Sequence, residues 1–418
     1  MADAIQTEAV SLEGEDYYQD PWGFFARLRE SRPVTKVRMP GYGHAWVVTR
    51  YADVRAALAD PRLARDTNRW PGGARSRPSE ARGVAAHMLH ADPPDHPRLR
   101  RPVQRAFTPR RIAQLQPRTA QIAASLADEM ATAGEVTDLL TAYARPLPVT
   151  VLCELLGVPE ADRSRVSATV LRYDAAGEMP RVEDDLAAYF TGLIAARRAE
   201  PGDDLLSALI TASDESDQTE RQLTVTELVS TAFLLVMAGF DTTVNLIASG
   251  TLALLTHPQE LARLRADRSL LPATVEELLR FTSPVNHAND RFTTEEVSIG
   301  GTTVPAGEWV IIALPSANRD PARFPGPDSL DFGRDTSGHV AFGHGIHYCL
   351  GAPLARMETA VALSTLLDRF PRLSLAVPQE TLRWRSVSLM NGLESLPVRL
   401  GRAVAVREDC SAKFFDTC

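Results

Sequence analysis

Apolar residues recur at helical spacing over most of the chain, and patterns typical of strands are confined to a few short segments. The longest helical pattern covers residues 224–255, where no proline interrupts the apolar positions before Pro258. Thr224 and Glu227 stand three residues apart at its start, as in a capping box. The pattern therefore predicts a helix of about 32 residues, ~48 Å long at 1.5 Å per residue, which would cross a whole domain.

Strand patterns flank this helical region on both sides. We expect strands at 34–39 and 45–49, between helices that begin at Pro21 and Tyr51. Residues 112–222 have the pattern of successive amphipathic helices. Later strands are expected at 297–299, 303–305 and 309–314, with a last β region around 388–393. The sequence thus predicts a mainly α fold with small β-sheets.

Composition and charge narrow the class of protein. The chain has 418 residues, of which 44% are hydrophobic and 23% charged, as in a soluble globular protein. No Gly/Ser-rich or charged linker divides it, so we expect one domain over 1–401 and a tail of unknown role over 402–418. The net charge of −8 disfavours nucleic acid as a partner. An acidic N-terminus without an apolar core, and an apolar run of only 232–240, predict a cytoplasmic protein without a membrane anchor.

Four cysteines are present, at Cys153, Cys349, Cys410 and Cys418, and their spread does not indicate a disulfide framework. The last two could pair with each other or lie free in the tail. Only Cys349 lies in a motif, because residues 342–356 read F-G-H-G-I-H-Y-C-L-G-A-P-L-A-R.

Glycines on both sides of Cys349 allow a tight bulge and the close approach of a flat ligand. A helix starting beyond Gly351 would lower the pKa of the thiol through its unpaired N–H groups and favour metal ligation. No second Cys or His stands at zinc spacing, whereas a single axial thiolate suits haem iron. The alternative is a buried free thiol.

The pattern F-G-x-G-x-H-x-C-x-G resembles the cysteine-ligand loop of the cytochromes P450, and the likeness extends over about residues 20–401. It implies the cytochrome P450 fold, in which a helical domain surrounds a buried haem b beside a smaller β-rich region. Cys349 would be the axial thiolate, and Phe342 and Gly351 would contact the cofactor.

The resemblance also implies a set of residues for the haem propionates: His96, Arg100, Arg291 and His347. His96 and Arg100, at i and i+4, lie on one face of a helix. A solvated basic face is the alternative. Further arginines at 101, 105, 110 and 111 suit an acidic electron-transfer partner, or else a solvated surface.

The segment A-G-F-D-T-T at 238–243 interrupts an otherwise apolar helix. Gly239 costs roughly 1 kcal/mol relative to alanine there, so it needs a reason. The resemblance implies that the helix opens locally to admit dioxygen and water, with Asp241 and Thr242 relaying protons. The alternative is a packing notch with Asp241 in a salt bridge.

Two further groups of residues follow from the resemblance. Glu277, Arg280 and Arg323 would form a buried charge network that fixes the cysteine loop, although an E-x-x-R spacing alone is common. The substrate would lie under a roof at 61–89 and a lid at 171–190 interrupted at Gly177 and Pro180. Its expected contacts are Met88, Leu89, Met237, Ala238, Val285, Leu389 and Met390.

We therefore expect a haem-thiolate monooxygenase that hydroxylates or epoxidises a hydrophobic natural product, resembling actinobacterial hydroxylases of macrolides and other polyketides. No flavin or nicotinamide motif is present, so the resemblance implies electrons from a ferredoxin and a separate NAD(P)H-dependent ferredoxin reductase. The protein would act as a monomer. One alternative is a peroxide-driven peroxygenase, which the Asp241–Thr242 pair disfavours. Another is a non-catalytic haem-binding sensor or docking protein, for which the chain carries no second domain.

Overall fold

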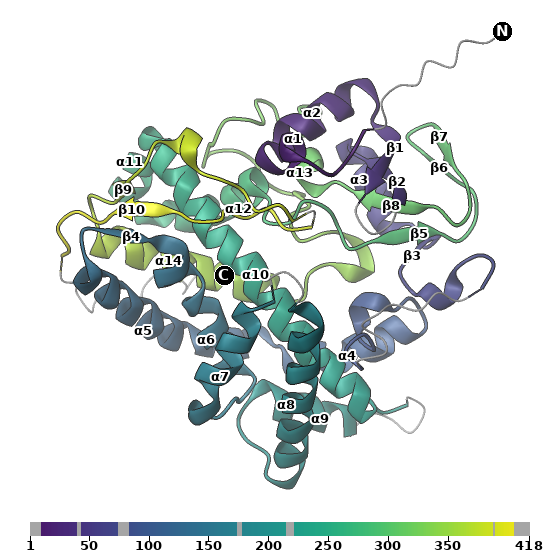
Figure 1. The fold of residues 1–418 in the computed structure, drawn as a ribbon, viewed down its shortest axis with the longest axis horizontal. Helices are drawn as coiled ribbons and strands as arrows, with labels where there is room; N and C mark the ends of the chain where they lie inside the picture. Colours follow the sequence, from purple (N-terminus) through teal and green to yellow (C-terminus); the bar gives the residue numbers. More distant parts are fainter. Residues whose placement is uncertain are drawn as a thin grey trace.

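The computed structural model describes residues 10–39, 43–73, 83–173, 178–214, 221–387 and 389–404. Figure 1 shows a large helical part traversed by one long helix, α10, and a smaller β-rich part that contains the first helices of the chain. The expected fold class, mainly α with small β-sheets, is confirmed. The tail residues 405–418, with Cys410 and Cys418, lie outside the described residues.

The α-helices follow the periodic apolar segments of the sequence. Their bounds are α1 Glu15–Gln19, α2 Pro21–Ser31, α3 Tyr51–Ala59, α4 Asp95–Ala106, α5 Pro109–Ala133, α6 Pro146–Leu155, α7 Glu160–Leu171, α8 Met179–Ala199, α9 Leu205–Asp214, α10 Val225–Thr256, α11 Pro258–Ala266, α12 Leu271–Thr282, α13 Leu314–Asn318 and α14 Ala352–Arg369.

Helix α10 is the centre of the helical part. Its capping box is formed as expected, because the Thr224 side chain accepts from the Glu227 N–H and the Glu227 carboxylate accepts from the Thr224 N–H at 2.7 Å. It packs against α6, α8, α12 and α14. By length and apolar composition α10 could cross a membrane, but 67% of its most apolar window is buried inside the protein. Its apolar surface is thus used for packing, as the core helix of the fold.

The strands form three small sheets. Their bounds are β1 Val34–Met39, β2 Gly43–Val48, β3 Leu63–Ala64, β4 Val136–Asp138, β5 Arg291–Thr293, β6 Val297–Ile299, β7 Thr302–Val304, β8 Trp309–Ile312, β9 Ser374–Leu375 and β10 Pro397–Arg399. The largest sheet has the order β1-β2-β8-β5-β3, and β2 runs parallel to β8. This sheet places Arg291, the first residue of β5, beside the helical part.

Proline explains two of the differences between the expected and the observed boundaries. The strand expected at 309–314 ends at Ile312, because Pro315 lies in the first turn of α13. Pro180 does not interrupt a lid helix but lies in the first turn of α8, where its missing N–H costs nothing. Gly177 lies outside the described residues.

Candidate functional site

The loop that carries Cys349 is held by backbone geometry which glycine permits. Gly343 and Gly345 have φ angles of 73° and 76°, in the left-handed region. At Gly345 a Cβ would also lie only 3.1 Å from the Leu58 carbonyl oxygen of α3. The loop closes where the Cys349 N–H donates to the Phe342 carbonyl at 2.9 Å, and α14 begins three residues later at Ala352. The thiol is thereby fixed at the start of a helix, as the sequence predicts.

The pKa of the Cys349 thiol differs from the sequence expectation. Burial raises this pKa, and the N–H groups of Gly351 and Ala352 and the guanidinium groups of Arg100 and Arg356 lower it only in part. Desolvation of the thiolate therefore outweighs the helix terminus. A metal ion at this position would itself deprotonate the thiol.

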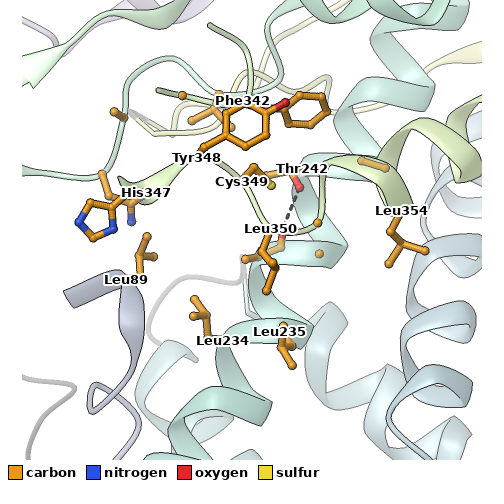
Figure 2. Close-up of a pocket in the computed structure, with 18 of the residues that line it drawn as sticks. Leu89, Leu234, Leu235, Thr242, Phe342, His347, Tyr348, Cys349, Leu350 and Leu354 are labelled. Atoms are coloured by element: carbon orange, nitrogen blue, oxygen red, sulfur yellow. Dashed lines mark hydrogen bonds between the residues drawn. The ribbon is translucent and has the colours of Figure 1, made fainter. Parts of the chain in front are cut away.

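Cys349 lies in the wall of a cavity of about 260 Å³. Leu234 and Leu235 of α10 lie across this cavity from Phe342 and Tyr348 of the cysteine loop (Figure 2). Four of the expected substrate contacts are in the wall: Met88, Leu89, Ala238 and Val285.

The other three expected contacts do not line the cavity. Met390 instead pairs with Val285 in an isolated antiparallel bridge, and the Leu389 carbonyl accepts from the Asn286 N–H at 2.8 Å. The backbones of Leu389 and Met390 thus bond to the segment that contains Val285, although their side chains do not line the cavity. Met237 is on α10 beside Ala238 but packs against the apolar core.

Much of the wall consists of leucines that the sequence analysis did not single out. In amphipathic helices a leucine facing a cavity has the same spacing as one facing the core, so no sequence signal separates them. These residues are Leu152, Leu155, Leu156, Leu205, Leu246, Leu279 and Leu314. Polar lining residues that were also missed are Arg65, His287 and Asn289.

The four residues expected at the propionates come together at one edge of the cavity. The rings of His96 and His347 are 4.4 Å apart in an edge-to-face arrangement, and the Arg100 Nη2 donates to the Tyr348 carbonyl at 2.6 Å. Arg291 is 3% exposed and donates from Nη1 to the Leu63 carbonyl at 3.2 Å. Arg65, which is 4% exposed, lines the same cavity.

Several polar atoms of this cluster are buried without a hydrogen-bond partner among the described residues. They are Nε2 of His96, Nε2 of His347, and Nε and Nη2 of Arg291. Burial and the neighbouring guanidinium groups lower the pKa of His96 to about 4 and lower that of His347 further; burial lowers the pKa of Arg291 to about 10. The buried Arg291 guanidinium, with donors that are unpaired among the described residues, matches a ligand with anionic groups, as the two propionates of haem would provide.

Helix α10 presents Thr242 to the cavity in an unbroken helix, without the local opening that the resemblance implied. The Thr242 Oγ1 donates to the Ala238 carbonyl at 2.7 Å (Figure 2). A Cβ at Gly239 would lie 2.9 and 3.1 Å from the two Cδ atoms of Leu152, so this glycine lets α6 pack closely. The packing notch that was the alternative explanation is therefore what the contacts at Gly239 show.

Asp241 is 8% exposed and forms an ion pair. Nη2 of Arg385 donates to both of its carboxylate oxygens, at 2.8 and 2.9 Å, and lies 3.2 Å from Oδ1 of Asn245. Gly392 makes room for this arrangement, since a Cβ there would lie 2.2 Å from Asn245 Oδ1. No sequence signal pointed to Arg385, which is 144 residues from its partner.

Comparison with known proteins decides the family. The cytochrome P450 profile matches residues 168–392. The chain is 46% identical to the vitamin D(3) 25-hydroxylase of Pseudonocardia autotrophica, covering 94% of this chain and 97% of that protein. The chain belongs to the cytochrome P450 family.

Two further comparisons agree with this. The mycinamicin IV hydroxylase/epoxidase of Micromonospora griseorubida is 44% identical over 90% of this chain and 94% of its own. The solved structure of the ligand-free P450 monooxygenase TamI superposes with a TM-score of 0.85, at 46% identity and with 94% of each chain covered. This P450 is accordingly a monooxygenase that uses dioxygen, and its family implies a haem with a cysteine thiolate ligand.

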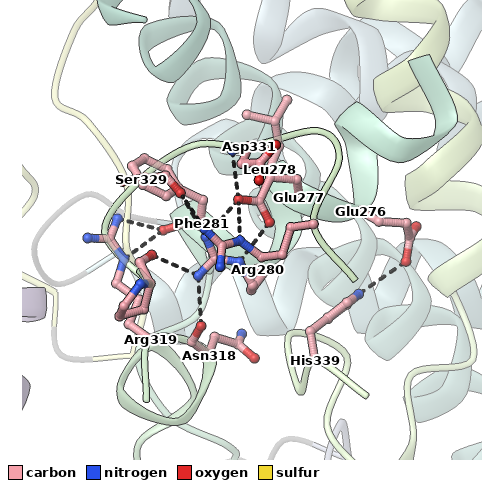
Figure 3. Close-up of polar contacts among 12 residues, drawn as sticks. Glu276, Glu277, Leu278, Arg280, Phe281, Asn318, Arg319, Ser329, Asp331 and His339 are labelled. Carbon is pink, nitrogen blue, oxygen red and sulfur yellow. Dashed lines mark hydrogen bonds and ion pairs between the residues drawn. The ribbon is translucent and has the colours of Figure 1, made fainter. Parts of the chain in front are cut away.

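The P450 also contains a buried ion pair behind the cysteine loop. Arg280 and Glu277 of α12 are both fully buried, and Arg280 donates to the two carboxylate oxygens at 2.7 and 2.8 Å (Figure 3). Arg280 also donates to the carbonyls of Asn318 and Pro327, both at 2.9 Å. These bonds fasten α12 to the segment that leads into the cysteine loop.

The third residue of this network is Arg334, which corrects the prediction of Arg323. The Arg334 Nε lies 3.2 Å from Glu277 Oε1, and the Asp331 N–H donates to the same oxygen at 3.1 Å. Arg323 instead donates to the Ser337 carbonyl and covers the Phe324 ring at 4.7 Å. Both arginines lie in the same irregular meander, where a sequence carries no periodicity that could tell them apart.

Glu276, next to Glu277, makes a second connection to the loop. It bonds to His339 at 3.1 Å (Figure 3). It also bonds to Arg356 of α14 at 2.9 Å, and Arg356 lies 4.6 Å from the Phe342 ring. Although burial alone would raise it, these two partners lower the pKa of Glu276 to about 2. Glu276 thus connects α12 to the chain before Cys349 through His339 and to the helix after it through Arg356.

Proposed function

We propose that this P450 binds haem b and hydroxylates or epoxidises a hydrophobic natural product of the macrolide or polyketide class. The observation that carries the proposal is the Cys349 thiol in the wall of a leucine-lined cavity whose edge holds the buried Arg291 guanidinium, with donors that are unpaired among the described residues. Relatives that tailor antibiotics and polyketides support the substrate class.

In this proposal the Cys349 thiolate would hold the haem iron, and Phe342 and Gly351 of the same loop would contact the cofactor. His96, Arg100, Arg291 and His347 would bind the propionates, and the unpaired donor atoms of Arg291 would gain charge-assisted hydrogen bonds. Bound haem supplies activation of dioxygen, to which the thiolate contributes electron density. Glu277, Arg280 and Arg334 keep the loop in place.

On the opposite wall, Thr242 and Asp241 handle protons. The Thr242 hydroxyl, which donates to the Ala238 carbonyl in the structure, would rotate toward the cavity to hold a water there. Asp241 exchanges protons with solvent while Arg385 keeps its carboxylate oriented. The leucines of α6 and α10 exclude bulk water, so protons arrive through these positioned groups.

Electrons are proposed to come from a ferredoxin and its NAD(P)H-dependent reductase in the cytoplasm. Arg101, Arg105 and Arg110 are exposed along α4 and the start of α5, near the cysteine loop that Arg100 contacts. Complementary charge speeds the encounter of such partners. The P450 itself is proposed to act as a monomer.

The test is the reduced carbonyl spectrum of Cys349→Ser. We expect the red-shifted band of a thiolate-bound haem to be abolished, whereas Cys153→Ser, a matched change of the other described cysteine, keeps it. Turnover with ferredoxin, reductase and NADPH should exceed turnover with hydrogen peroxide. A red-shifted band in Cys349→Ser would place the ligand elsewhere, and turnover with peroxide alone would favour a peroxygenase.

A further inference from the structure

His287 is a buried polar residue in the cavity wall for which the proposed reaction has no use. It lies at a bend between α12 and β5, and the backbone is fixed on both sides of it. The Asn286 N–H donates to the Leu389 carbonyl at 2.8 Å and the Ala288 N–H to the Ile312 carbonyl at 2.9 Å. His287 is 2% exposed and lines the cavity. The ring is therefore held at a defined place in the wall.

The hydrogen bonding of the ring determines what it offers to the cavity. Nδ1 lies 3.0 Å from the Ala288 carbonyl oxygen. A carbonyl can only accept, so Nδ1 carries the proton in this bond, and in the neutral imidazole Nε2 is then an acceptor. Asp290 Oδ1, 4.0 Å from Nδ1, also faces the protonated side of the ring.

The Nε2 atom is buried and has no hydrogen-bond partner among the described residues. A buried acceptor that forms no hydrogen bond lowers the stability of the folded protein. A bound group that donates to Nε2 would remove this cost. The adjacent lining residues Pro284, Val285 and Ala288 have no side-chain donor, and the donors of Asn289 and Arg291, farther along the same segment, do not bond to Nε2. For the neutral ring a propionate is not a suitable partner, because a carboxylate also only accepts. The partner must be a donor that enters the cavity.

We propose that Nε2 of His287 accepts a hydrogen bond from a hydroxyl group of the substrate. The inference rests on the proposed function and narrows the substrate class that it names. The substrate would have an apolar skeleton that carries a hydroxyl group. Pure hydrocarbons and molecules whose hydroxyl groups are all alkylated would bind less well. His287 is then a specificity-determining residue that orients the skeleton through one polar contact, while the leucines supply the remaining contact area.

The experiment uses two rigid, compact probes that differ by one donor, 1-adamantanol and 1-methoxyadamantane. Their dissociation constants are measured by the haem spectral shift in the wild-type holoenzyme, in His287→Phe and His287→Leu, and in His44→Phe. His44 is exposed on β2, so it is a matched control. Two replacements of different size separate loss of the acceptor from a change in cavity volume. Haem content and the carbonyl spectrum show that each variant is folded.

We expect the wild type and His44→Phe to prefer the alcohol over the ether by about threefold to tenfold, the effect of one net hydrogen bond. Both His287 variants should lose that preference. A ratio that is unchanged in the His287 variants would overturn the inference, and so would a resting wild-type spectrum of nitrogen-ligated haem that His287→Leu abolishes. If neither probe nor any macrolide shifts the spectrum of a haem-loaded, thiolate-ligated wild type, the proposed substrate class fails, and the inference with it.

Discussion

Thr242 is the residue of the proposed mechanism whose position is defined by both a hydrogen bond and the cavity wall. Its hydroxyl is in the cavity wall and bonded to the Ala238 carbonyl at 2.7 Å, so it can rotate toward a ligand without a change in α10. Asp241, its neighbour in sequence, is held by Arg385 and does not line the cavity. The two adjacent residues thus contribute a hydroxyl on the cavity side and a carboxylate on the other.

The first prediction concerns Thr242→Ala. We expect this variant to bind substrate and consume NADPH and dioxygen, but to form product at least about tenfold less efficiently per electron and to release hydrogen peroxide, because a positioned proton donor is lost. Product and peroxide are quantified per NADPH oxidised.

Thr251→Ala is the matched control, since Thr251 makes the same bond to the Ile247 carbonyl at 2.7 Å in α10 but does not line the cavity. Full coupling in Thr242→Ala would mean that another group supplies the proton.

At the scale of elements, α10 is placed by its N-terminal cap. Thr224 and Glu227 satisfy each other's backbone N–H groups, and Glu227 also accepts from Arg98 of α4 at 2.6 Å. The cap therefore fixes the start of α10 and connects it to α4, which carries His96 and Arg100.

We predict that Thr224→Ala lowers the free energy of unfolding by about 1 kcal/mol, the usual cost of a lost N-cap. Thr226→Ala, an exposed position in the first turn, should change it by less than about 0.5 kcal/mol. Thermal unfolding of the two holoenzymes is the measurement, and equal melting temperatures would show that the cap does not limit stability.

Helix α14 contains a carboxyl group with a perturbed pKa. Glu358 is 1% exposed, both of its carboxylate oxygens lack a hydrogen-bond partner among the described residues, and burial raises its pKa well above the ordinary 4.5. Because the pKa is higher in the folded state, the stabilising contribution is complete below about pH 4.5 and is lost as the pH rises toward the folded value.

The prediction is that Glu358→Gln, which retains the neutral form, raises the melting temperature relative to wild type more at pH 8 than at pH 5. The melting temperature of the variant is compared with that of wild type at each pH, so that the effects of other titrating groups cancel in the difference. A difference between variant and wild type that does not change with pH would contradict a raised pKa.

At the scale of the whole molecule, the buried pair Glu277–Arg280 joins α12 to the meander before the cysteine loop. Arg334 completes it and has a side chain only 9% exposed, whereas that of Arg323 is 29% exposed. Loss of Arg334 would leave a buried carboxylate oxygen with one donor fewer.

We therefore expect Arg334→Ala to destabilise the holoenzyme by about 1–3 kcal/mol and to speed haem loss. Arg323→Ala should cost at most about 1 kcal/mol. Melting temperature and haem transfer to apomyoglobin report the two effects, and the reverse order of the two variants would refute the assignment.

The sequence by itself determined the elements that depend on local patterns. The capping box set the start of α10, the proline and glycine positions set the ends of several helices, and the glycines around Cys349 set the loop that presents the sulfur. These features depend on backbone angles and on neighbours within one or two turns, so they can be predicted from the sequence alone.

Only the tertiary structure decided which long-range partners meet. Arg385 reaches Asp241, Arg334 replaces Arg323 at Glu277, and Leu152 accounts for Gly239, yet none of these pairs has a sequence signal. The sequence equally could not separate cavity leucines from core leucines, or foresee that burial would raise the pKa of Cys349. Such outcomes depend on packing and desolvation, which arise only when elements distant in the chain come together.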